Sequence, residues 1–141
     1  MRVVVSGAAG FIGDEVVRAL RGAGHEVRGL DLAGADIEAD VAEPGAWQDL
    51  GAVDAVIHTA AMVGMPSRTD AFWRVNTLGT RHVLDAARDS GAHRFVLLSS
   101  VTVFGNDFPD GVTEEYPTRP TGVPYADTKI AAEHLCLDEH I

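Results

Sequence analysis

The sequence predicts an α/β protein built on a doubly wound parallel sheet, in which strands and helices alternate along the chain. Three observations lead to this prediction: short runs of β-branched residues, helical apolar patterns between them, and a glycine-rich turn after the first run. Parallel strands joined by helices form right-handed crossovers, and ligands gather at the carboxyl ends of such strands. We therefore expect the functional residues to follow the strands.

The first half of the chain contains the expected core strands. Residues 2–6 form a β-branched run that is typical of a strand buried on both faces of a parallel sheet. A helix is expected over 11–23, where the apolar residues recur at helical spacing: Phe11, Ile12, Val16, Val17 and Leu20. The elements that follow are a strand at 27–31, an irregular stretch at 33–40, a short helix at 44–50 and a buried strand at 54–58.

The second half continues the alternation. A long amphipathic helix is expected to begin at Pro66 and Ser67 and to end before Gly91, and a fourth strand follows at 94–99. Residues 105–124 are rich in Gly, Pro and Thr and are predicted to be a loop, and a last helix begins at Tyr125. A length of 141 residues suits one domain, 1–141.

Composition excludes several classes of partner. The chain has 11 Lys and Arg against 21 Asp and Glu, and its net charge of -10 repels nucleic acids and anionic membranes. A single cysteine, Cys136, forms no internal disulfide and completes no zinc site, so we expect no metal and a reducing cytoplasm. The apolar run 3–5 is too short for a signal peptide, and no transmembrane segment is expected.

A glycine-rich turn joins the first strand to the first helix. Gly7, Gly10 and Gly13 lack side chains, so a pyrophosphate can approach the backbone N–H groups at the positive end of the helix. By itself the spacing also fits a tight turn that binds nothing. Asp31 ends the second strand, where a carboxylate accepts hydrogen bonds from both adenosine ribose hydroxyls and repels a 2'-phosphate. Unless Asp31 is merely a solvated strand end, NAD is favoured over NADP.

Three further residues can carry chemistry. Tyr125 and Lys129 are one helical turn apart, so a phenol and a cation that favours its phenolate can face one cleft. Ser100 follows the fourth strand, where a hydroxyl can donate to a substrate oxygen. Taken alone, such a Tyr–Lys pair more often lies on a solvated helix surface.

Together these residues resemble the extended short-chain dehydrogenase/reductase family, in its NAD-dependent epimerase/dehydratase group, from residue 1 to about residue 135. The resemblance implies a Rossmann domain and a homodimer formed by the helix at 68–90 and the helix from Tyr125. It assigns these residues to the cofactor: Gly7, Gly10, Phe11, Ile12, Gly13, Asp31, Asp40, Val41, Thr59, Ala60, Ala61, Asn76, Tyr125 and Lys129. Thr59 to Ala61 follow His58 in a segment similar to the family's His-x-Ala-Ala, and Asp40 and Val41 would contact the adenine.

The resemblance also implies a mechanism. Tyr125 would take the proton of a substrate hydroxyl while a hydride passes to NAD, Ser100 would bind the substrate oxygen, and Lys129 would hold the nicotinamide ribose. Val101 and Thr102 stand where the dehydratases of the group carry Asp-Glu, so an epimerase, reductase or dehydrogenase is favoured. The substrate would be a sugar nucleotide or a related small molecule.

Members of this family are longer, and their C-terminal part supplies most substrate contacts. We therefore expect the domain to be incomplete relative to the family, truncated after the helix that carries Tyr125 and Lys129. Two alternatives follow: a catalytically inactive NAD-binding or sensor module, and a remnant of a longer enzyme.

Overall fold

The computed structural model describes residues 1–64 and 69–139, so the helix start expected at Pro66 and Ser67 lies outside the described residues. The strands are β1 (Arg2–Ser6), β2 (Glu26–Asp31), β3 (Ile37–Glu38), β4 (Ala55–His58) and β5 (Phe95–Leu97). The α-helices are α1 (Phe11–Gly22), α2 (Asp70–Phe72), α3 (Gly79–Asp89) and α4 (Pro124–Leu137). Three further helical segments lie within the described residues. Two are 3-10 helices, η1 (Ala46–Gln48) and η3 (Val101–Phe104), and one is a π-helix, η2 (Trp73–Leu78).

The strands form one parallel sheet in the order β3-β2-β1-β4-β5. The first strand of the chain is therefore the central one, with Val3 opposite Val27 on one side and Ala55 on the other. This arrangement confirms the predicted doubly wound parallel sheet. The short strand β3 lies in the stretch 33–40 that was expected to be irregular, because two residues are too few to show an apolar pattern.

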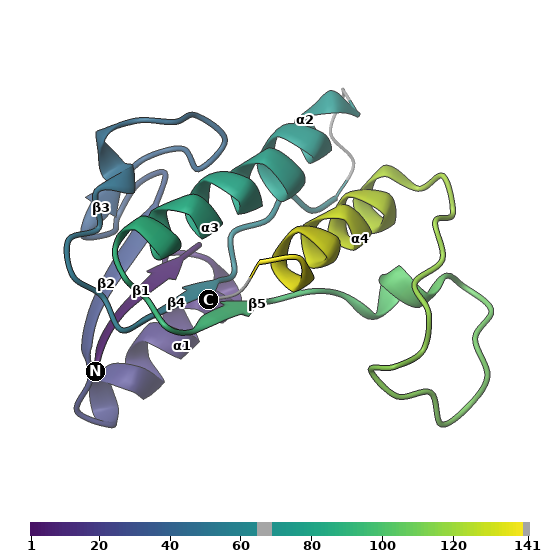
Figure 1. Ribbon diagram of the computed structural model, residues 1–141, viewed down its shortest axis with the longest axis horizontal. Coiled ribbons are helices and arrows are strands. Elements are labelled where there is room, and N and C mark those ends of the chain that lie inside the picture. Colours follow the sequence, from purple (N-terminus) through teal and green to yellow (C-terminus); the bar gives the residue numbers. More distant parts are fainter. Residues whose placement is uncertain (65–68, 140–141) are drawn as a thin grey trace.

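Helices cover both faces of the sheet, as Figure 1 shows, with α1 on one side and α3 and α4 on the other. On the α1 side Val3 and Val5 pack against Val17, and on the α3 side Val4 and Val56 pack in the cluster that contains Val83. The side chains of β1 thus alternate between two apolar cores. The strand is buried on both faces, as its β-branched run predicts.

The start of α1 differs from the expected apolar face. Gly13 and Val17 are buried, whereas Phe11 is 97% exposed and Ile12 is 47% exposed. At 100° per residue, Phe11 lies about 200° around the helix from Gly13 and so points to solvent. The apolar stripe that faces the sheet therefore begins only at Gly13.

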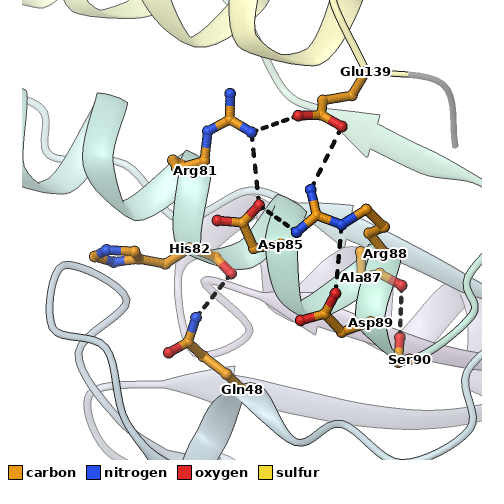
Figure 2. Close-up of polar contacts among 9 residues, drawn as sticks. All are labelled: Gln48, Arg81, His82, Asp85, Ala87, Arg88, Asp89, Ser90 and Glu139. Carbon is orange, nitrogen blue, oxygen red and sulfur yellow. Dashed lines mark hydrogen bonds and ion pairs between the residues drawn. The ribbon is translucent and has the colours of Figure 1, made fainter.

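The end of α4 is fastened to α3 by ion pairs (Figure 2). Glu139 Oε1 lies 2.6 Å from Arg81 Nη1, and its Oε2 lies 3.6 Å from Arg88 Nη1. Asp85 lies between these two arginines, 3.0 Å from Arg88 Nη2 and 3.6 Å from Arg81 Nη1. Asp85 within α3 and Glu139 after α4 thus each form ion pairs with both arginines of α3.

Candidate functional site

The glycine turn is built so tightly that side chains are excluded. Gly7 has φ +75°, and a Cβ on it would lie 2.6 Å from the Ala60 nitrogen. A Cβ on Gly13 would lie 1.9 Å from the Gly7 carbonyl oxygen, nearer than any real contact. Gly10 is the N-cap of α1 and offers no side chain to its free N–H groups. The turn leaves the positive end of the helix open to an anionic group.

Asp31 closes one side of this turn. Its Oδ2 accepts a hydrogen bond of 2.9 Å from Ala9 N, and its Oδ1 accepts one of 2.7 Å from Leu32 N. Each carboxylate oxygen keeps a second acceptor site. The carboxylate is therefore held at the strand end with capacity left to accept further hydrogen bonds.

A cavity of about 430 Å³ opens between the glycine turn and the carboxyl ends of β1, β2 and β4. The predicted cofactor residues in its wall are Gly7, Gly10, Asp31, Asp40, Val41, Thr59, Ala60 and Ala61. The remaining wall residues, which the sequence did not single out, are Ala9, Leu30, Leu32, Ala39, Met62 and Val75. An apolar wall with few polar groups suits an adenosine. The glycine turn, which a Cβ would fill, and the carboxylate of Asp31 in the same cavity wall both fit a dinucleotide.

Asp40 stands at the far rim of this cavity. Its Oδ1 accepts a hydrogen bond of 2.9 Å from Ala42 N, and its Oδ2 lies 3.9 Å from Arg74 Nη2. Arg74 pairs more closely with Glu43, at 2.5 Å. Asp40 thus lies in the cavity wall, and its contact to an adenine stays a prediction.

The remaining predicted residues lie outside the wall of this cavity. Phe11 and Ile12 border a separate hollow beside the first turn of α1, and Gly13 is buried beneath the glycine turn. Asn76, Ser100, Tyr125 and Lys129 come from η2, the segment after β5, and α4. The structure thus gathers part of the predicted residues in one cavity wall and leaves Asn76, Ser100, Tyr125 and Lys129 outside it.

Lys129 is buried although it carries an amine. Only 3% of the residue is exposed, and its Nζ donates a hydrogen bond of 2.6 Å to the carbonyl oxygen of Leu98. Burial lowers the pKa of Lys129 below its usual value. Tyr125, one turn earlier, packs edge-on against Phe72 with 6.2 Å between ring centroids. The amine of Lys129 on α4 thus lies beside Leu98, the residue that follows β5.

Ser100 is the N-cap of η3. Its Oγ accepts from Thr102 N at 3.3 Å and lies 2.9 Å from Thr102 Oγ1. Ser100 lies three residues after Leu97, the last residue of β5, on the side of the sheet where ligands bind in such folds. Capping fixes the direction of its side chain.

Asn76 fastens two segments of the site to each other. Its Oδ1 accepts from Met62 N at 2.7 Å, and its Nδ2 donates to Met62 O at 3.2 Å and to Thr128 Oγ1 at 3.1 Å. The side chain thus links the loop after β4 to α4, in agreement with a supporting role. Its partner Thr128 was missed because a threonine inside a helix carries no pattern of its own.

A metal-binding cluster and a membrane-spanning helix are both absent from the part of the chain that the structure describes. Within residues 1–64 and 69–139 no cluster of three or more His, Cys, Asp or Glu side chains could hold a metal ion. In those same ranges no helix has the length and apolar character needed to cross a bilayer.

Known proteins resemble this chain in sequence and in fold. The model of a family described as NAD dependent epimerase/dehydratase matches residues 3–140. A 3-beta-hydroxysteroid dehydrogenase of Mycolicibacterium neoaurum is 31% identical over 159 residues, which take in 99% of this chain and 43% of that protein.

Solved structures agree. A short-chain dehydrogenase/reductase superfamily protein from Agrobacterium tumefaciens with bound NAD has a TM-score of 0.84 and 37% identity, over 96% of this chain and 44% of that one. MoeE5 in complex with UDP-glucose and NAD has a TM-score of 0.85 and 34% identity, over 97% of this chain and 48% of that one.

The chain spans less than half the length of each of these proteins. The resemblance noted in the sequence is confirmed, and so is NAD as the cofactor of the family. Since that family model matches residues 3–140 and the strands form one parallel sheet, the chain belongs to the NAD-dependent epimerase/dehydratase family of extended short-chain dehydrogenases/reductases.

Proposed function

We propose that residues 1–141 are the NAD-binding domain of an enzyme that transfers a hydride at a hydroxyl or carbonyl carbon. The observation that carries this proposal is the cavity under the glycine turn, with the carboxylates of Asp31 and Asp40 in its wall. Gly7, Gly10 and Gly13 leave room for a pyrophosphate, and Phe11 and Ile12 supply N–H groups at the start of α1. NAD, when bound, supplies the hydride acceptor.

The chain's own residues would handle the substrate proton. Tyr125 would accept the hydroxyl proton of the substrate, and Ser100 would donate to the same oxygen. Lys129, which donates to Leu98 O in this structure, would supply the positive charge that favours the phenolate and would bind the nicotinamide ribose. Asn76 would hold the loop after β4 in register with α4.

The proposed substrate is a sugar nucleotide or a related small molecule with a secondary hydroxyl. Support comes from the relatives, which include a structure with UDP-glucose and a 3-beta-hydroxysteroid dehydrogenase. Both UDP-glucose and a 3-beta-hydroxysteroid present a secondary alcohol. These two compounds are therefore the first substrates to test, with the appearance of reduced nicotinamide as the readout.

Calorimetric titration tests the cofactor proposal. Wild type should bind NAD more tightly than NADP, and Asp31→Asn should weaken NAD binding about tenfold and remove the preference, because the ribose hydroxyls lose an ionised acceptor. Asp49→Asn is the matched control, since Asp49 accepts from Gly51 N outside the cavity. Absence of heat with NAD would overturn the proposal, and equal binding of NADP would overturn the role of Asp31.

Tyr125→Phe tests the catalytic proposal. The variant keeps the aromatic ring that packs against Phe72 and should bind NAD as wild type does. Turnover should fall about a hundredfold or more, which is the usual contribution of an acid–base group. Undiminished turnover in the variant would contradict the role given to Tyr125.

A second candidate function is an NAD-binding or sensor module without turnover, or a remnant of a longer enzyme. The observation that favours it is the share of each relative that the chain spans, which is less than half. NAD binding with neither reduced nicotinamide nor an epimerised product from either test substrate would support this candidate over the enzyme.

We also propose a homodimer. Trp73 and Leu78 of η2 and Leu137 of α4 are large apolar side chains between 45% and 79% exposed, on the helices that the family resemblance assigns to a dimer. Sedimentation of wild type and of Leu137→Asp tests this; a wild-type monomer would contradict it.

A cytoplasmic location is proposed from composition. The single cysteine, Cys136, is free, which suits a reducing compartment. Cell fractionation checks this proposal.

A further inference from the structure

A row of buried polar side chains runs through the molecule from β1 to α4. Its members are Ser6, His58, Thr80, Asn76 and Thr128, and each is at most 1% exposed. They come from β1, β4, α3, η2 and α4, so every layer on this side of the sheet contributes one. Polar groups are costly to bury unless they are hydrogen-bonded, and each member of this row is bonded to the next, Thr80 through the backbone carbonyl oxygen of Asn76 rather than its side chain.

The first half of the row has a defined direction. Thr80 Oγ1 donates its single proton to the carbonyl oxygen of Asn76 at 2.6 Å, so it accepts from His58 Nε2 at 3.0 Å. Nε2 of His58 therefore carries a proton, and burial, which lowers the pKa of His58 to about 3, keeps the imidazole neutral with no proton on Nδ1. Its Nδ1 accepts from the Ser6 hydroxyl at 2.5 Å.

The second half of the row ends on α4. The Asn76 amide donates to Thr128 Oγ1 at 3.1 Å, and Thr128 Oγ1 in turn donates to the carbonyl oxygen of Tyr125 at 2.9 Å. Thr128 directly precedes Lys129 and lies in the same turn as Tyr125. The row therefore ends at the two residues to which the proposed function assigns proton transfer and cofactor binding.

At its other end the row touches the cavity. Ser6 directly precedes Gly7, and the carbonyl oxygen of Ser6 accepts hydrogen bonds from Thr59 N at 3.0 Å and Thr59 Oγ1 at 2.7 Å. Gly7 and Thr59 both line the cavity. A ligand that moves this part of the wall must also move the Ser6 end of the row.

We propose that this row couples the cavity to α4, with His58 and Thr80 as positioning residues for Tyr125 and Lys129. The inference rests on the proposed function, since it takes the adenosine side of NAD as the ligand. In a buried row whose donors and acceptors are all used, displacement of one member breaks a hydrogen bond unless the next one follows. Occupancy of the cavity and placement of α4 therefore favour one another.

Lys129 provides a direct readout because it is the only lysine in the sequence. An amine-selective acylating reagent can modify only Lys129 and the N-terminal amine, and the N-terminal amine serves as the internal reference. The probe ligand is ADP, which fills the adenosine and phosphate side but lacks the nicotinamide half that would reach Lys129. Any protection of Lys129 by ADP therefore reports the coupling.

In wild type, saturating ADP should slow the acylation of Lys129 about fivefold or more, the lower end of the range for coupled sites. Thr80→Val removes the hydroxyl that joins His58 to Asn76 and should abolish this ADP effect. Thr77→Val is the matched control: it removes a hydroxyl that donates to Thr128 O at 3.2 Å but leaves the row intact. The control should keep the ADP effect, because its row of hydrogen bonds is intact. Both variants remove a hydroxyl, so a general loosening of α4 would affect both of them.

If ADP binds and its effect persists unchanged in Thr80→Val, or is lost equally in Thr77→Val, the coupling is wrong. If calorimetry shows that ADP does not bind wild type, the proposed function fails and the coupling fails with it, which is a different result. Should Thr80→Val not fold, Thr80→Ser and Ser6→Ala replace it. The serine variant keeps a hydroxyl and should restore the ADP effect, and Ser6→Ala should lose it.

Discussion

The carbonyl oxygen of Gly7 occupies the place where a side chain on Gly13 would begin. A Cβ added to Gly13 would lie 1.9 Å from that oxygen and 2.7 Å from the Gly7 carbonyl carbon. The first turn of α1 and the end of β1 are thus packed backbone against backbone, and the shape of the cavity depends on this contact.

Gly13→Ala should therefore lower the free energy of unfolding by about 3 kcal/mol or more, since neither backbone can move aside without cost. Gly22→Ala is the control, because Gly22 ends the same helix and a Cβ there would have no neighbour within 4 Å. Urea unfolding should show the control at or slightly above wild-type stability. Equal stability of the two variants would contradict the contact.

The buried His58 should make stability depend on pH. Burial, and secondarily the charge of Lys129, lowers the pKa of His58 from 6.5 to about 3. At a pH between these two pKa values, His58 is protonated in the unfolded chain and neutral in the folded chain. Stability should therefore decrease as pH falls from about 6.5 towards 3, by about 1.4 kcal/mol per pH unit.

Comparison of wild type with His58→Gln isolates this contribution, since the other histidines titrate in both proteins. Urea unfolding between pH 4.5 and 6.5, within the window set by the two pKa values, should show a shallower pH dependence in the variant. Identical pH slopes would mean that His58 is charged in the folded protein.

The end of α4 depends on Glu139. Hydrogen bonds and ion pairs with Arg81 hold the pKa of Glu139 below its usual value. Glu139→Gln should speed amide hydrogen exchange in the last turn of α4, and high salt should produce the same change in wild type. Asp89→Asn is the control, because Asp89 pairs with Arg88 on α3 itself (Figure 2). Exchange that responds equally to both variants would show that Glu139 has no special part.

Cys136 should be a slow nucleophile. Burial raises the pKa of its thiol from 9.0 to about 11. Two pKa units reduce the thiolate fraction about a hundredfold, so alkylation by iodoacetamide near neutral pH should be slower than in the urea-unfolded chain by at least that factor. Equal rates in the two states would show that the last turns of α4 open freely.

Local patterns predicted the parts of the fold that depend on neighbours in sequence. The run of β1, the glycine turn and Asp31 at the end of β2 each follow from a few adjacent residues, and the structure places all three around one cavity. The π-helix η2 could not be predicted in the same way. Its wider turn is accompanied by bonds from Asn76 to Met62 and to Thr128, which lie 14 and 52 residues away.

The partners of His58 show the same limit. The sequence placed His58 beside the cofactor segment, but its side chain points away from the cavity wall to Ser6 and Thr80, 52 and 22 residues away. Nothing near His58 in the sequence distinguishes a buried, neutral imidazole from a solvent-exposed one. Phe11 shows a further limit of local patterns. It belongs to the helical apolar pattern of α1, yet its side chain lies in solvent.

The central position of β1 has a consequence for folding. β1 is made first, yet one of its edges pairs with β4, whose residues lie about 50 positions further along the chain, as in the pairing of Ser6 with His58. During synthesis β1 can pair early only with β2, and its second edge stays open until β4 has emerged. Closing that long loop is entropically costly, so nucleation of the sheet centre should limit the folding rate.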